Sequence, residues 1–223
     1  MDFFDQLVRD TQAEREALYA VPLIRDAATG NITRETYLAY LAQAYHHVKH
    51  TTPLLMATGS RLSSAQEWLR EAIAEYIEEE LGHQEWILND IAAAGGDKEA
   101  VRHSMPNAAT ELMVAYAYDT VMRGNPVGFF GMVFVLEGTS TALATGIAET
   151  LMQSLGLKRT SFTYLLSHGT LDLSHMEFFK GLMNRIDREE DKQAIVHMAK
   201  RMFVLFADMF RSIPRHTEVS HAA

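Results

Sequence analysis

The chain has 223 residues, of which 48% are hydrophobic and 22% charged, with a formal net charge of −9. These values are typical of a soluble globular protein of one domain with a substantial core. The acidic balance argues against a nucleic-acid surface, because no compensating basic stripe is present. The absence of cysteine excludes disulfides, thiolate metal sites and a cysteine nucleophile.

Neither a targeting signal nor a membrane segment is expected. The first residues, MDFFDQLVRD, lack a basic region followed by an apolar region, so no signal peptide is visible. The longest apolar stretch, around residues 127–136, is too short and too often interrupted by glycine to span a bilayer. We therefore expect a cytoplasmic protein.

Apolar residues recur with helical periodicity along nearly the whole chain, and no hairpin signal flanked by alternating apolar residues occurs. Glycine, proline and asparagine divide this pattern into seven predicted helices. They span 3–27, 33–59, 64–94, the stretch from the Pro106–Asn107 turn to 123, 126–155, 158–186 and 188–211. We predict an all-α fold, a single-domain bundle of about seven helices over residues 1–213, with a mobile C-terminal tail at 214–223.

The sixth predicted helix carries three polar residues on one face. His168, Asp172 and His175 are spaced by four and three residues, so they share a face. That face also carries the apolar residues Leu165, Met176, Phe179, Leu182 and Met183. Burying a carboxylate and two imidazoles is costly unless they are paired, and a metal ion is an economical partner.

The third predicted helix contains the acidic run EYIEEELGHQEW. Such a run is usually a solvated surface, and most of its acids lie on the polar side of the helix. Glu80 and His83 instead share a stripe with Leu69, Ile73 and other apolar residues. The phase therefore predicts an inward-facing Glu80-x-x-His83 pair.

Glu137 is the only charged residue between Arg123 and Glu149, on the most apolar predicted helix. A lone glutamate in such a helix requires a partner. Two other interpretations stay open: an ion pair with a buried arginine or lysine, or a protonated, hydrogen-bonded acid.

Together these residues form a candidate metal-binding set. An acid-x-x-His spacing alone is a weak signal, but the shared inward phase of several such residues strengthens it. Two acid-x-x-His pairs occur, Glu80 with His83 and Asp172 with His175, and Glu137 and His168 add single ligands. This arrangement is similar to the carboxylate-bridged di-iron site of helical bundles. Oxygen and imidazole ligands favour iron, or manganese, over copper(I) or structural zinc. The set comprises Glu80, His83, Glu137, His168, Asp172 and His175.

A second group of histidines lies on the second predicted helix, next to Tyr45. Tyr45 is near the apolar stripe, whereas the phase directs His46, His47 and His50 away from it. We interpret these histidines as surface residues or as residues that support the ligands without binding metal.

The segments ITRETYLAYLAQAYHH and FVLEGTS and the ligand motifs resemble the heme-oxygenase-like superfamily. That superfamily includes thiaminase-type proteins, quinone synthases and di-metal oxidases. The sharpest similarity is to the di-metal oxidases, through ELGH at 80–83, Glu137 and the histidines and aspartate at 168–175. The resemblance implies that Glu80, His83 and His168 hold one metal and Glu137, Asp172 and His175 the other. It also argues against heme binding, because Glu14–Arg15 stands where a heme-ligating histidine is expected.

The function that this resemblance implies is that of a non-heme di-iron oxidase or oxygenase. It would activate O2 in the core of the bundle with two iron ions per chain, and would oxidise an amino-acid-like, fatty-acid-like or aromatic small molecule. An external electron donor and a homodimer are further expectations. Two alternatives remain: a helical protein that binds metal without turnover, and a metal-independent, cofactor-less oxidase of the quinone-synthase type.

Overall fold

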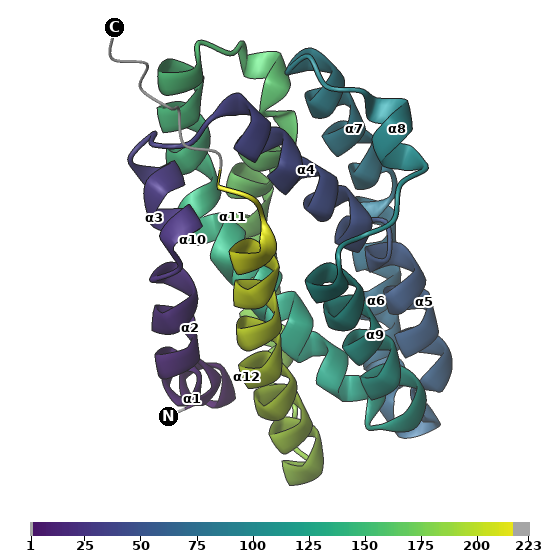
Figure 1. Ribbon diagram of the computed structural model, residues 1–223. Helices are drawn as coiled ribbons and strands as arrows, with labels where there is room; N and C mark the ends of the chain where they lie inside the picture. Colours follow the sequence, from purple (N-terminus) through teal and green to yellow (C-terminus); the bar gives the residue numbers. More distant parts are fainter. Residues whose placement is uncertain (1, 216–223) are drawn as a thin grey trace, which may run out of the picture.

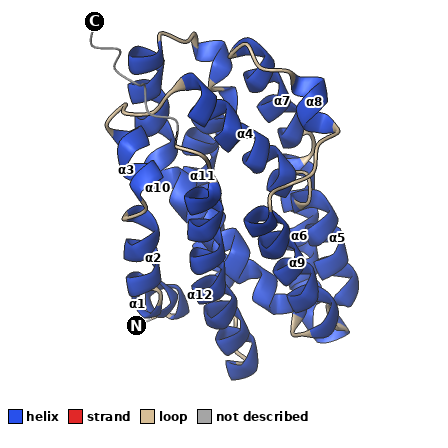
Figure 2. Cartoon of the chain, viewed as in Figure 1, coloured by secondary structure: helices blue, strands red, loops and turns tan. Residues whose placement is uncertain are grey.

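The computed structural model describes residues 2–215, apart from the side chains of residues 168–175. The described chain is helical and contains no β-strand in residues 2–215 (Figure 2). Its α-helices are α1 (Phe3–Asp10), α2 (Gln12–Tyr19), α3 (Pro22–Ala28), α4 (Arg34–Val48), α5 (Thr51–Arg61), α6 (Glu67–Glu80), α7 (His83–Ala93), α8 (Lys98–Arg102), α9 (Ala108–Arg123), α10 (Phe130–Leu155), α11 (Thr163–Met183) and α12 (Glu189–Ser212). Short 3₁₀ turns are η1 (Ser64–Gln66), η2 (Pro126–Phe129) and η3 (Arg159–Ser161). The predicted all-α bundle is confirmed.

The helices outnumber the seven predicted segments because the first three segments are broken and because the short helix α8 was not predicted. The first segment becomes α1, α2 and α3, the second becomes α4 and α5, and the third becomes η1, α6 and α7. Each of these breaks spans no more than two residues. So short a break leaves the apolar periodicity almost in phase, which is why the sequence pattern continues through it.

The long helix α10 is the central element of the bundle. It packs most extensively against α11 and α12 and also contacts α3 (Figure 1). With η2 it forms a 30-residue segment, Pro126–Leu155, that is long and apolar enough to cross a membrane, with a mean hydropathy of 1.5 in its most apolar 18-residue window. The prediction that no stretch is long enough was therefore wrong. However, 67% of that 18-residue window is buried inside the bundle, as expected for a core helix.

A glycine sets the distance between α10 and α12. A Cβ atom built at Gly131 would lie 2.4 Å from the carbonyl oxygen of Ile195 and 2.7 Å from the backbone nitrogen of Ala199. Both atoms belong to the α12 backbone, which cannot move aside as a side chain can. The two helices therefore pack backbone to backbone at this point.

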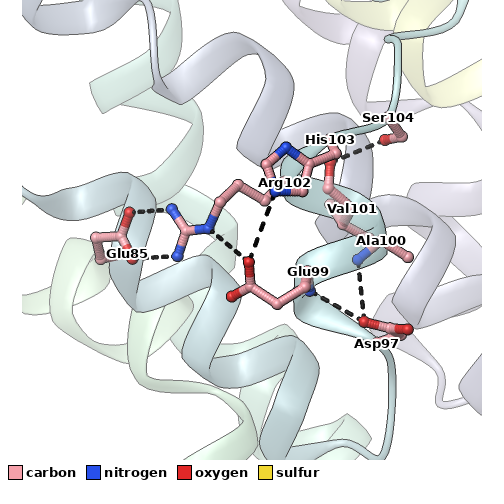
Figure 3. Close-up of polar contacts among 8 residues, drawn as sticks. All are labelled: Glu85, Asp97, Glu99, Ala100, Val101, Arg102, His103 and Ser104. Carbon is pink, nitrogen blue, oxygen red and sulfur yellow. Dashed lines mark hydrogen bonds and ion pairs between the residues drawn. The ribbon is translucent and has the colours of Figure 1, made fainter.

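A polar network joins the short helix α8 to α7 on the outside of the bundle (Figure 3). Arg102 donates to both carboxylate oxygens of Glu85, at 2.7 and 2.9 Å, and to Glu99 at 3.3 Å. Asp97 accepts from the backbone N–H groups of Glu99 and Ala100, at 3.0 Å each, and so caps α8. The network fixes the chain that follows α7.

Candidate metal centre and its cavity

A cavity of about 150 Å³ lies inside the bundle, lined by residues of α3, α4, α5, α6, α10, α11 and α12. Most of its lining is aliphatic or aromatic. Glu80 and Glu137 are the two acids of the described lining, and His47 is its histidine. Two carboxylates from helices far apart in the sequence thus line one largely apolar cavity.

Glu80 and His83 meet across a bend, not along one continuous helix. Glu80 is the last residue of α6 and His83 the first of α7, and Gly82 between them has a φ of +91°. The prediction of a single helix over 64–94 was therefore wrong, because a glycine in the left-handed region interrupts it. The bend nevertheless keeps the pair together. His83 Nδ1 lies 3.0 Å from Glu80 Oε2, and the two side chains are 4% and 11% exposed.

Glu137 is in the middle of α10 and is buried, with 8% of the residue exposed. Its helix begins at Phe130, directly after η2, whose N-cap Asn125 accepts from the N–H of Val127, and it ends before Gly156, whose φ is +62°. The neighbouring turns of α10 contribute Val133, Leu136 and Ser140 to the same cavity. Glu137 is thus held at the cavity wall by a rigid core helix.

The other three predicted ligands lie on α11. The side chains of His168, Asp172 and His175 fall outside the described residues, whereas the helix itself runs unbroken from Thr163 to Met183. Among the residues whose side chains are described, no group of three or more histidine, aspartate or glutamate residues could hold a metal ion. The predicted six-ligand set therefore remains a prediction as a whole.

A buried aspartate anchors the start of α11. Asp90 of α7 is fully buried and accepts from the N–H of Thr163 at 3.0 Å, from the Thr163 hydroxyl, and from the N–H of Tyr164 at 2.8 Å. Burial raises the pKa of this carboxyl, and the three hydrogen bonds oppose that rise. Asp90 thereby caps a helix 73 residues away and sets the position of α11 relative to α7. Asp90 was not among the predicted site residues, since nothing in its local sequence pattern indicates a partner so distant.

His46 and His47 of α4 are buried, so the interpretation of these two histidines as surface residues was wrong, whereas a role in supporting the ligands remains a prediction. His46 and His47 are 1% and 3% exposed, and His47 lines the cavity. His46 Nε2 lies 2.9 Å from the Ser104 hydroxyl, and His50 Nδ1 lies 3.1 Å from the Tyr118 hydroxyl. The interpretation failed because α4 contacts both α7 and α9 and also borders the cavity, so it has no single buried face.

Comparisons with known proteins agree with this architecture. A family model described as "iron-containing redox enzyme" matches residues 38–207. No curated protein matches the chain.

Several solved structures share the fold. A domain of unknown function with a heme oxygenase-like fold from Shewanella denitrificans is 24% identical, with a TM-score of 0.86 over 94% of this chain and 91% of that chain. A TenA homologue from Pseudomonas syringae pv. tomato is 12% identical, with a TM-score of 0.78 over 94% and 91%. Heme oxygenase-1 from Synechocystis, in complex with heme, is 11% identical, with a TM-score of 0.75 over 95% and 91%. The predicted heme oxygenase-like fold is thus confirmed.

Proposed function

The chain belongs to the family of iron-containing redox enzymes, and from this premise we propose that it is a non-heme oxidase or oxygenase with two iron ions at its cavity. The observation that carries the proposal is the burial of Glu80 and Glu137 in one apolar cavity. No lysine or arginine lines this cavity among the described residues. Desolvating two carboxylates there is costly, and a divalent metal offsets that cost.

The donor chemistry fits iron. Carboxylate oxygens and imidazole nitrogens suit iron, with manganese as the alternative, and the chain offers no thiolate. The Glu80–His83 hydrogen bond matches the way carboxylates orient metal-bound histidines. Helical spacing supports the α11 residues: positions 168 and 172 follow the cavity-lining Leu165 by three and seven residues, on the same helix face.

In the proposed reaction, iron supplies the electron-transfer chemistry that activates O2. The carboxylates of Glu80, Glu137 and Asp172 would hold the iron and neutralise its charge, and His83, His168 and His175 would act as neutral nitrogen donors. The apolar lining excludes water and holds the body of a small-molecule substrate. In this proposal an external donor supplies the electrons for O2 reduction that the substrate does not provide. The active form is proposed to be a homodimer.

The test is an anaerobic titration of the metal-stripped full chain with Fe(II), followed by mixing with O2 under optical observation. We expect about two irons per chain and a transient absorption band. Glu137→Gln and Asp172→Asn should each lower the iron content to one or less. Glu78→Gln, an exposed acid on α6, is the matched control and should retain both irons.

The alternatives predict other outcomes. Two irons without O2 consumption would indicate a metal-binding protein without turnover. Full iron loading in both the Glu137→Gln and the Asp172→Asn variant would contradict the ligand assignment. No iron binding in the wild type, with oxidation of substrate by the metal-free protein, would favour a cofactor-less oxidase.

A further inference from the structure

The chain leaves α12 in a short extended segment, residues 213–215, which we call the strap. Proline cannot continue a helix, and Pro214 pushes the residue before it into an extended conformation. Ile213 accordingly has a φ of −74° and a ψ of 127°, and it is buried, with 3% of the residue exposed. Figure 1 shows the strap in yellow, rising from the end of α12 between α3 and α4. Its start is therefore fixed in the core, and its end reaches two other helices.

Two side-chain contacts hold the strap to these helices. The Thr36 hydroxyl, near the start of α4, donates to the carbonyl oxygen of Pro214 at 3.3 Å. The Arg215 guanidinium forms an ion pair with Asp26, near the end of α3, at 3.0 Å. The two side chains of this pair are 53% and 31% exposed. The strap thus links α12, α4 and α3, which are distant in the sequence.

The same three helices border the cavity at the strap. Thr36 lines the cavity, Ala27 lines it next to Asp26, and Phe210 lines it from the last turn of α12. α3 packs mainly against α10 and α12, and α4 packs mainly against α7 and α9. In the described part of the chain, no extensive packing therefore joins α3 to α4. The strap bridges the two helices at the point where their own packing does not.

We propose that the strap closes the cavity between α3 and α4, and that small molecules enter when the ion pair between Asp26 and Arg215 opens. Entry by separation of core helices would expose buried apolar surface, which costs far more than the loss of one hydrogen bond and one partly exposed ion pair. The strap can therefore open while the bundle stays folded. This inference does not rest on the proposed function, because it concerns the route into the cavity and not the chemistry inside it.

The lack of cysteine in the chain makes this route measurable. Ala144 is buried in α10 and lines the cavity, so Ala144→Cys places a single thiol there. Its rate of reaction with methyl methanethiosulfonate reports how often the cavity opens. Ala148 is buried in the same helix but does not line the cavity, so Ala148→Cys reports unfolding of the bundle instead. If thermal unfolding shows that Ala144→Cys is not folded, Ser140→Cys provides another cavity-lining thiol.

The ion pair is then removed in the full chain that carries Ala144→Cys. Asp26→Asn and Arg215→Gln should each raise the labelling rate about two- to fivefold, the range expected for a partly exposed ion pair. Added salt should accelerate labelling when the ion pair is present and have little effect in Asp26→Asn. Arg211→Gln is the matched control, since it removes an exposed ion pair with Asp208 within α12, and it should leave the rate unchanged.

A charge swap tests whether the two residues act on each other. Asp26→Arg alone places two arginines side by side and should accelerate labelling more than Asp26→Asn does. Adding Arg215→Asp restores an ion pair of opposite orientation and should return the rate to within about twofold of the wild type. Equal labelling of the cavity thiol in the wild type and all single variants would overturn the proposal. The same acceleration at Ala148→Cys would also overturn it, because it would show that the whole bundle unfolds.

Discussion

Glu80 and Glu85 lie on either side of the Leu81–Gly82 bend, and their carboxylates have opposite surroundings. Glu85 is 45% exposed and accepts two hydrogen bonds from Arg102 in the network outside α7 (Figure 3). These hydrogen bonds lower the pKa of Glu85. Glu80 is 11% exposed, contacts His83 and lines the internal cavity.

The two glutamates come from one acidic run, so residue type and local composition do not distinguish them. What differs is the partner: a guanidinium at the surface for Glu85, and an imidazole at an apolar cavity for Glu80. An exposed ion pair contributes little to stability. A buried carboxylate is costly unless a positive partner, such as a metal ion, compensates its charge. Within this acidic run, Glu85 is therefore a solvated surface residue and Glu80 is a candidate metal ligand.

The largest expected effect separates these two carboxylates directly. Glu80→Gln should weaken Fe(II) binding by at least about 100-fold, because it removes a charged oxygen ligand from the proposed centre. Glu85→Gln should leave Fe(II) affinity within about twofold and lower the Tm by no more than about 2 °C. Anaerobic Fe(II) titration and thermal unfolding of both variants provide the measurements. Similar iron affinities for the two variants would contradict the assignment of Glu80, and not Glu85, as a metal ligand.

A smaller effect concerns His46, which links α4 to Ser104 just after α8. Burial and the nearby Lys49 lower the pKa of His46 from 6.5 to about 4. As the pH falls from about 6.5 to 4, the unfolded chain takes up a proton that the folded chain does not. The free energy of unfolding should therefore decrease in this window, by at most about 2 kcal/mol for this residue.

Denaturant unfolding between pH 7 and pH 4 measures this contribution. His46→Asn should give a flatter dependence than the wild type in that range. His103→Asn, at an exposed histidine near the same network, should leave the dependence unchanged and is the control. A wild-type slope in the His46→Asn variant would show that other groups account for the acid sensitivity.

The smallest effect concerns the bend that separates Glu80 from Glu85. Gly82→Ala should lower the free energy of unfolding by about 1 kcal/mol, because alanine is strained at a φ of +91°. The added Cβ meets no atom within 4 Å, so the loss reports backbone strain alone. Gly146→Ala, in the middle of α10 with similar free space, should be neutral or stabilising. Chemical denaturation measures the free energy of unfolding of both variants. Equal losses in the two would indicate a general effect of the substitution and not backbone strain at Gly82.

Periodicity and composition were enough to predict the helical class, the segment boundaries within a few residues, and the inward positions of Glu80, His83 and Glu137. Glu80 stands in a helix with one apolar side, where the 3.6-residue repeat relates sequence position to burial, and His83 stays beside it across the bend. Glu137 is the lone acid of an apolar core helix, so composition alone indicated its burial. The same rule failed for His46 and His47, because α4 is covered on more than one side and almost every direction from it is inward.

The sequence by itself therefore determined what each helix must bury, including the acids that make a metal centre the favoured hypothesis. Only the tertiary structure decided the bend at Gly82, the capping of α11 by Asp90 and the cavity beside α10. Each of these depends on groups far apart in the chain or on a backbone conformation that leaves apolar spacing unchanged. Local patterns carry no information about such contacts, because their energies arise only when the helices pack together.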